Sequence, residues 1–297
     1  RVERANLVPA HHDTSLPRLI FSHNRIILAL YICVNQLTHR SPPITIAPMR
    51  ILLTNDDGIF APGLAAIYKK LTALGDVTVV APSSSRSGAS HSVTFNRPFV
   101  CSKVEIQGQF TGYSVDGSPA DCVKLAVFEL CKEPIDLLVS GINNGANTGI
   151  NIYYSGTVAA AMEGIFLKIP SVAMSLAWEE TDMDFELAAE HCFDIIQKIL
   201  PVSSDSVINI NIPHLSRGKP KGVRIVPQSH ECFHEYFECR TNEQGQTLYQ
   251  LAGGQHRPEE ILTDTVSIAD GFITITPLSP GRLDTKQTKK LKKIKFV

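Results

Sequence analysis

Short apolar runs alternate with segments of helical pattern along most of this chain, and no other feature restricts its fold as strongly. The runs are rich in β-branched and aliphatic residues, as expected of strands buried on both faces, and they lie at 51–54, 77–81, 135–140 and 172–175. Apolar residues at helical spacing predict helices between them, at 62–71, 119–131 and 157–167. Strand and helix in alternation predict an α/β fold, in which helices cover both faces of a mostly parallel sheet.

The chain changes character after a helix predicted at 185–200. From Ser206 onward most segments are extended in pattern and punctuated by proline, at 207–212, 223–226, 233–239, 247–251 and 272–276. A further extended stretch, 92–115, interrupts the alternation and predicts a hairpin. We therefore expect an α/β core at 49–205 and a basic tail at 286–297. Between them, residues 206–285 are expected to form either a smaller β-rich part or arms that pack on a neighbouring subunit.

The first 48 residues lack the periodicity of the rest, and a clean strand begins only at Met49. We expect residues 1–48 to be a dispensable extension, with the natural start at Met49. Their longest apolar run, 26–34, has nine residues. A transmembrane helix needs about 20. No small-residue cleavage site follows a basic start, so neither a membrane span nor a signal peptide is predicted.

Cysteine usage and charge bear on the compartment and on the partners. Seven cysteines are scattered without a C-x-x-C pair, which argues against a disulfide framework and a cysteine zinc site. We expect a cytoplasmic protein without membrane contact. The net charge of −1 conceals an acidic body, because residues 49–284 carry about −10 and six lysines follow them. Those lysines predict a solvated tail and no specific nucleic-acid binding.

Side chains that offer oxygen donors follow three of the predicted strands. Asp56 and Asp57 follow the first, a serine-rich segment at 83–90 follows the second, and Asn143 follows the third. Each segment alone could be an ordinary turn. In an open α/β sheet, however, the loops at the carboxyl ends of neighbouring strands meet in one crevice. Oxygen donors without cysteine or histidine predict a hard divalent cation there, Mg²⁺ or Mn²⁺.

A small-residue turn, Tyr154-Ser155-Gly156-Thr157, opens the helix predicted at 157–167. One interpretation is purely structural, with a Ser or Thr hydroxyl group as the N-cap of the helix. The free backbone N–H groups and the dipole of a helix start also favour a bound phosphate. A divalent cation beside a phosphate-binding site is typical of enzymes that hydrolyse phosphoesters.

Several long motifs occur in order between Met49 and about Pro280, and together they resemble the SurE family of metal-dependent nucleotidases. They are Met49-Arg-Ile-Leu-Leu-Thr-Asn-Asp-Asp-Gly58, Arg86-Ser-Gly-Ala-Ser90, Asp116-Gly-Ser-Pro-Ala-Asp-Cys122, Ser140-Gly-Ile-Asn143 and Tyr154-Ser-Gly-Thr-Val-Ala-Ala-Ala-Met-Glu-Gly164. The resemblance implies a Rossmann-like three-layer fold, with a C-terminal extension exchanged between the subunits of a homodimer or homotetramer. It also implies a 5'/3'-nucleotidase and, in part of the family, an exopolyphosphatase.

The resemblance assigns roles to individual residues. The metal ligands would be Asp56, Asp57, Ser87 and Asn143, which would hold one Mg²⁺ or Mn²⁺ per subunit, and the two aspartates would be catalytic. The substrate would be bound by Asn55, Asn147, Ser155, Gly156 and Thr157. We expect the cation to connect Asp56, Asp57 and Asn143 with a phosphate oxygen and to activate either a water or an aspartate as the nucleophile.

One segment departs from the family pattern. Ser83, Ser84 and Ser85 precede Arg86 where the family usually has a charged residue such as Asp. This difference bears on loop contacts near the substrate and leaves Ser87 in place.

The residues also allow two other functions. His230-Glu231-Cys232-Phe233-His234 matches the zinc-protease pattern H-E-x-x-H, which works only on a helix. Its neighbours are aromatic and β-prone, so an extended segment is predicted. A nucleotide-binding regulator without turnover is the other alternative. No G-x-G-x-x-G follows the first strand, and the chain has neither a P-loop nor a G-x-S-x-G motif.

Four further residues receive structural interpretations. Asp116 and Asp121 flank Pro119 and are predicted to cap the following helix. His91 is predicted to be a loop residue close to Ser87, and Trp178 a packing or rim residue.

Overall fold

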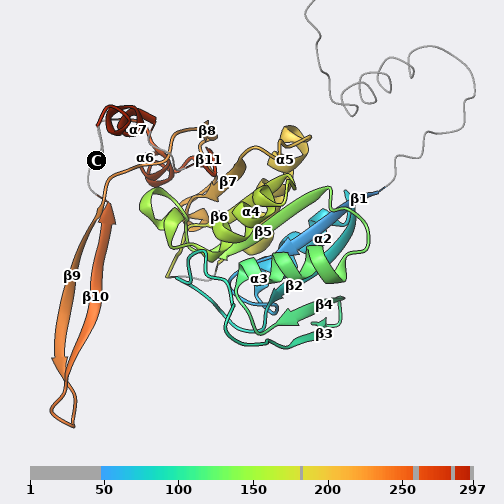
Figure 1. The fold of residues 1–297 in the computed structure, drawn as a ribbon, viewed down its shortest axis with the longest axis horizontal. Coiled ribbons are helices and arrows are strands. Elements are labelled where there is room, and N and C mark those ends of the chain that lie inside the picture. The colour runs from blue at the N-terminus through green and yellow to red at the C-terminus, as the bar shows by residue number, and fades with distance from the viewer. Residues whose placement is uncertain (1–47, 181–182, 257–260, 282–284, 295–297) are drawn as a thin grey trace, which may run out of the picture. The chain divides into compact units, whose positions relative to one another are not determined.

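The structure is a computed structural model that describes residues 48–180, 183–256, 261–281 and 285–294. A nine-stranded sheet runs through it in the order β3-β4-β2-β1-β5-β6-β7-β11-β8 (Figure 1). Its central strands are parallel to one another. They are β2 (Gly75–Pro82), β1 (Met49–Thr54), β5 (Leu137–Asn144), β6 (Ser171–Leu176) and β7 (Val207–Ile212). The prediction of an α/β fold with a mostly parallel sheet is confirmed.

Strand β1 shows why the predicted strands are apolar without interruption. Ile51 and Leu53 belong to one buried cluster, and Leu52 belongs to the cluster on the opposite face of the sheet. Helices α2 (Pro62–Leu71) and α5 (Phe185–Ile199) pack against each other over the first cluster. Helices α3 (Pro119–Leu125) and α4 (Gly156–Phe166) pair over the second. Both faces are therefore covered, as in other doubly wound α/β proteins.

The helix predicted after Ser118 and its predicted caps need a small adjustment. The segment predicted as one helix at 119–131 divides into α3 and a short π-helical turn, Ala126–Leu130. Helix α3 begins with a capping box, in which Ser118 accepts a hydrogen bond from the N–H of Asp121 and the Asp121 carboxylate accepts one from the N–H of Ser118. The cap predicted for Asp121 is confirmed, whereas Asp116 does not cap this helix.

Both ends of the sheet are built from extended excursions. The segment predicted as a hairpin at 92–115 contains β3 (Cys101–Ile106) and β4 (Phe110–Val115), which are antiparallel, and β4 joins β2 in parallel. At the other end, β11 (Ile273–Leu278) is antiparallel to β7 and parallel to β8 (Val223–Ile225). The extended region after residue 206 thus contributes in part to the main sheet.

The rest of that region forms a separate antiparallel hairpin, which extends away from the sheet in Figure 1. Its strands are β9 (Phe233–Thr241) and β10 (Thr247–His256). Helices α6 (Asp264–Ala269) and α7 (Thr285–Leu291) follow the hairpin.

Residues 1–47 lie outside the described residues, so the expectation about the N-terminal extension stays a prediction. Within the described ranges, no helix combines the length and the apolar character that crossing a bilayer requires. The cysteines in those ranges are all free.

Candidate active site

The segment after β1 forms a tight turn that presents Asp56 and Asp57 at the carboxyl edge of the sheet. The Asn55 side chain closes this turn, because its Nδ2 donates to the Gly58 carbonyl at 2.9 Å and its Oδ1 accepts from the Gly58 N–H at 3.2 Å. Gly58 has a φ of +104°, which favours glycine over any residue with a Cβ. Asn55 therefore supports the turn through its side chain.

Asp56 lies against the first turn of α4. Its side chain is buried, at 3 % exposure, and the Thr157 hydroxyl donates a hydrogen bond to its carboxylate. A Cβ on Gly156 would lie 2.8 Å from the Cβ of Asp56, so only glycine allows this approach. Ser155 caps the helix by accepting a hydrogen bond from the Val158 N–H at 3.1 Å. The structure thus brings a predicted metal ligand into contact with the predicted phosphate-binding turn.

Both carboxyl groups are held in surroundings that disfavour their charge. Burial raises the pKa of Asp56, although hydrogen bonds from Thr157 and the backbone of Gly156 act in the opposite direction. Burial, together with the charge of the neighbouring Asp56, raises the pKa of Asp57 to about 6. The Asn144 N–H, which donates to Asp57 at 2.9 Å, acts in the opposite direction. In the described part of the chain, neither carboxylate forms an ion pair with lysine, arginine or histidine.

The loop after β2 brings Ser87 to the same edge. The Arg86 N–H donates to the Asp56 carbonyl at 2.7 Å, which places the next residue, Ser87, beside the aspartate turn. Ser87 is exposed, and its hydroxyl lies 2.9 Å from that of Ser85.

The end of β5 contributes Asn143. Its side chain is buried, at 9 % exposure, and its Nδ2 donates to the Gly145 carbonyl at 2.6 Å. That bond orients the amide and leaves the Oδ1 oxygen as an acceptor. A cis peptide joins Gly141 and Ile142 just before it.

Asn147 is engaged elsewhere. Its Nδ2 donates to the Ser175 hydroxyl at 2.8 Å, and its carbonyl accepts hydrogen bonds from the side chains of Asn209 and Asn211 at 2.9 and 3.2 Å. These contacts brace the loop after β5 against β6 and β7. Within the described residues, its side chain makes no hydrogen bond with Asp56 or Asp57.

Known proteins are similar to this chain in sequence and in structure. The family model described as survival protein SurE matches residues 51–235. The chain belongs to the SurE family. It is 44 % identical over 234 residues to a protein of Rhodopirellula baltica named 5'-nucleotidase SurE, which covers 77 % of this chain and 92 % of that protein. It is 42 % identical over 234 residues to the protein of that name from Syntrophus aciditrophicus, with 77 % and 88 % covered.

A solved structure supports the same assignment. The crystal structure of the SurE protein from Aquifex aeolicus aligns with a TM-score of 0.71 and 37 % identity, covering 82 % of this chain and 98 % of that one. The resemblance of the sequence motifs to the SurE family is confirmed.

The donor set of this SurE chain fits a hard divalent cation. Asp56 is buried and its neighbour Asp57 is half-buried, and both have raised pKa values. Among the described residues, no cationic side chain pairs with either carboxylate. The remaining predicted donors are a hydroxyl and an amide oxygen, the ligands that Mg²⁺ and Mn²⁺ accept. The described residues contain no cluster of three or more histidine, cysteine, aspartate or glutamate side chains with the geometry for a metal.

The zinc-protease alternative is wrong for this SurE chain. Its first histidine, His230, precedes β9 in an irregular segment, and its second, His234, lies in that strand. The two histidines therefore do not share a helical face, which the H-E-x-x-H motif requires.

A groove of about 770 Å³ opens beside the start of α4. It runs along the helix face that carries Ser155, Ala159, Met162 and Phe166, and Tyr153 and His230 also line it. Of the residues predicted to bind metal or substrate, only Ser155 lines this groove.

Some contacts around the site could not be found from the sequence. Glu163 of α4, buried at 4 % exposure, accepts hydrogen bonds from His91 at 2.9 Å and Lys124 at 2.5 Å. Asp116 binds Arg86 and Arg97 at 2.9 and 2.8 Å. Each pair joins residues that are distant in sequence, and no local pattern marks them.

Proposed function

We propose that this chain is a metal-dependent phosphomonoesterase that hydrolyses nucleoside 5'-monophosphates to nucleoside and phosphate. The observation that carries the proposal is the contact of Asp56 with Thr157 and Gly156, which puts a carboxylate pair directly beside a helix N-terminus. The names of the related SurE proteins, 5'-nucleotidase, support the choice of substrate.

The cation would be Mg²⁺ or Mn²⁺, one per subunit, held by Asp56, Asp57, Ser87 and Asn143. When bound, such an ion supplies positive charge to the phosphate oxygens and acts as a Lewis acid. The acidic body of the chain, about −10 over residues 49–284, cannot attract an anionic substrate over long range. The positive charge needed for binding is therefore local.

The protein's own groups orient the reactants. The turn Ser155-Gly156-Thr157 would present the N-terminal end of the α4 dipole to a substrate phosphate. The backbone N–H groups of Gly156 and Thr157 also face the Asp56 carboxylate. Thr157 and the Asn144 N–H hold the two carboxylates in fixed directions. Either a water or an aspartate is the nucleophile, and in both cases the fixed carboxylates determine the line of attack on the phosphorus.

Two wider activities follow from the same site. Nucleoside 3'-monophosphates and short polyphosphates also present a terminal phosphate to the helix N-terminus, so both are candidate substrates of the proposed enzyme. The groove beside Ser155 has apolar and aromatic walls, including Met162, Tyr153 and Phe166, which favours a nucleoside over a bare polyphosphate.

Assembly and location complete the proposal. The β9–β10 hairpin exposes large apolar side chains, with 64 % of Phe237, 68 % of Tyr249 and 55 % of Leu251 accessible. A second subunit that covers them would produce a homodimer or homotetramer. The free cysteines of the described residues are in keeping with a reducing compartment, the cytoplasm.

The test is phosphate release from a panel of nucleoside monophosphates, with Mg²⁺, with Mn²⁺ and with chelator. The expected result is release only with a divalent cation, and its loss in Asp56→Asn and in Asp57→Asn. Asp136→Asn serves as the control, because Asp136 binds Arg50 at the opposite edge of the sheet. Full activity in both site variants, or nucleotide binding without turnover in the wild type, would overturn the proposal.

A further inference from the structure

Arg86 is bonded on two sides, immediately before Ser87. Its backbone N–H donates to the Asp56 carbonyl at 2.7 Å, and its guanidinium donates to the Asp116 carboxylate at 2.9 Å. The first bond joins the loop to the end of β1. The second joins it to the residue that follows β4. These two bonds fix the position of Arg86, and therefore of the adjacent Ser87, next to the turn that carries Asp56 and Asp57.

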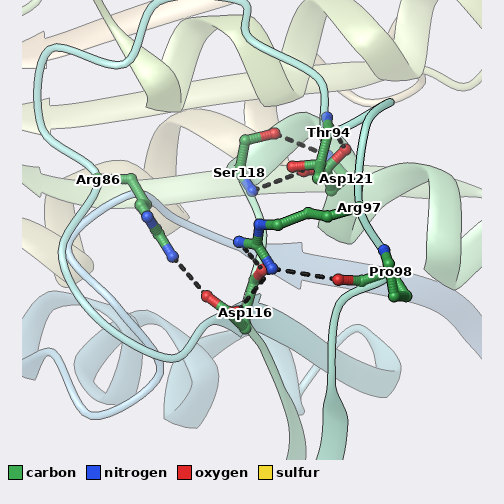
Figure 2. A network of polar contacts seen from close by, with 7 residues as sticks. All are labelled: Arg86, Thr94, Arg97, Pro98, Asp116, Ser118 and Asp121. Atoms are coloured by element: carbon green, nitrogen blue, oxygen red, sulfur yellow. Dashed lines mark hydrogen bonds and ion pairs between the residues drawn. The ribbon is translucent and has the colours of Figure 1, made fainter.

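Asp116 is shared by two arginines. Figure 2 shows the guanidinium groups of Arg86 and Arg97 turned toward its carboxylate. Arg97 bonds Oδ2 at 2.8 Å and the Asp116 carbonyl at 3.1 Å, which leaves Oδ1 to Arg86. The Arg97 hydrogen bond, followed by the charges of both arginines, holds the pKa of Asp116 below its ordinary value. Arg97 therefore fixes the direction of the Asp116 carboxylate, and that carboxylate in turn holds the Arg86 guanidinium.

The loop that carries Ser87 has few other restraints. Gly88 has a φ of +72°, and a Cβ placed on it would meet nothing within 4 Å. Downstream, Ser90 bonds the carbonyls of Tyr154 and Tyr153 at 3.0 and 2.6 Å. The loop is thus anchored on both sides of Ser87, and Arg86 is the anchor next to it. A short polar loop without such anchors would sample many conformations.

We propose that Asp116 is a positioning residue for the divalent cation, which acts through Arg86 to hold the Ser87 hydroxyl at the aspartate turn. This inference rests on the proposed metal site. Partners that orient metal ligands from outside the ligand set typically change metal affinity by about 10- to 100-fold when they are removed. The Asp116 pair is half-exposed, with 33 % of Arg86 and 46 % of Asp116 accessible, so it contributes little to overall stability.

The experiment is calorimetric titration of the full-length, chelator-treated protein with Mn²⁺. Asp116→Asn is expected to weaken Mn²⁺ binding about tenfold. Asp136→Asn is the matched control, because Asp136 also accepts from an arginine, Arg50, at 2.9 Å but lies at the opposite edge of the sheet. This control is expected to bind Mn²⁺ as the wild type does. Thermal unfolding without metal should be nearly the same for both variants.

A double-mutant cycle identifies the route of the effect. Ser87→Ala alone should weaken Mn²⁺ binding, and Asp116→Asn should add little in the Ser87→Ala background if it acts through that hydroxyl. Arg86→Ala offers a second way to break the same link, for use if Asp116→Asn does not fold.

The outcomes separate the two proposals. Wild-type Mn²⁺ affinity in Asp116→Asn and in Arg86→Ala, with weaker binding in Ser87→Ala, would overturn the positioning role alone. An additive loss in the double variant would also overturn it. Unchanged Mn²⁺ binding in Ser87→Ala and in Asp56→Asn would instead reject the proposed metal site.

Discussion

The Thr157 hydroxyl donates a hydrogen bond to the Asp56 carboxylate, across 101 residues of sequence. The bond joins the first turn of α4 to the turn after β1 at the carboxyl edge of the sheet. In the proposed enzyme these two turns bind the phosphate and the cation, respectively. A change at either residue should therefore disturb both functions.

Thr157→Val removes the hydroxyl and keeps the shape of the side chain. The buried Asp56 carboxylate then loses a charge-assisted hydrogen bond, so we expect the free energy of unfolding to fall by about 2 kcal/mol. Phosphate release should fall as well. Denaturant unfolding and a phosphate-release assay measure the two effects. Thr157→Ser retains the donor and should restore both, and equal losses in the two variants would contradict the role of the hydroxyl.

Gly156→Ala tests the close approach of α4 to Asp56. The added methyl group would lie 2.8 Å from the Asp56 Cβ and 3.0 Å from its Oδ2. We expect the aspartate to be displaced, with a stability loss of about 1 to 3 kcal/mol and weaker Mn²⁺ binding. Gly108→Ala is the control, since its nearest neighbour there is Glu105 Oε1 at 3.9 Å. That variant should lose stability through its positive φ and bind Mn²⁺ normally.

Asp57 predicts an unusual dependence of stability on pH in the chelator-treated protein. Its pKa of about 6 in the folded state exceeds its ordinary value of 3.8. Between these pH values the folded protein binds a proton that the unfolded chain does not, so this group makes folding more favourable as the pH falls from 7 to 5. Urea unfolding at pH 7, 6 and 5 measures the trend.

Asp57→Asn should remove this contribution to the pH dependence. It should also be more stable than the wild type at pH 7 without metal, because it no longer buries an ionised carboxyl group. Stability of the variant below that of the wild type at pH 7 would contradict the assignment of the shift to burial.

The hairpin predicts the state of assembly. Tyr249 and Leu251 lie on one face of β10, and Leu251 pairs with Phe237 of β9. Replacing Tyr249 and Leu251 together with lysine should disrupt a subunit contact made by this face. Light scattering should then give a mass close to the 32.5 kDa of one chain. Gln244→Lys, in the turn of the hairpin, is the control and should leave the wild-type assembly intact.

Deletion of residues 1–48 tests the expectation about the N-terminal extension. The SurE family match begins at residue 51, so a chain that starts at Met49 should release phosphate at the wild-type rate. The measurement is the same assay with equal concentrations of folded protein. A large loss of activity in a stably folded truncated chain would show that the extension is functional.

Much of the fold follows from local patterns. The apolar runs of β1, β2, β5 and β6 mark strands buried on both faces, and their alternation with helices implies parallel pairing. Parallel strands place all their carboxyl ends at one edge, so Asp56, Asp57 and Asn143 could be assigned to one crevice from the sequence. The serine-rich segment after the second strand and the helix start at Thr157 are also evident from local patterns, and the motif resemblance singles out Ser87 within that segment and indicates the family.

The contacts that orient these residues depend on the tertiary structure. Asp116 and Asp121 lie on either side of Pro119 and are alike in sequence, yet Asp121 caps α3 while Asp116 binds Arg86 and Arg97. Asn147 and Asn143 stand in the same loop region, yet the amide of Asn147 is bonded to Ser175. A local pattern specifies which residues reach the carboxyl edge of the sheet. The partner of each polar side chain is set by which strand ends and helix starts become neighbours on folding, because a hydrogen bond needs its two atoms within about 3 Å of each other.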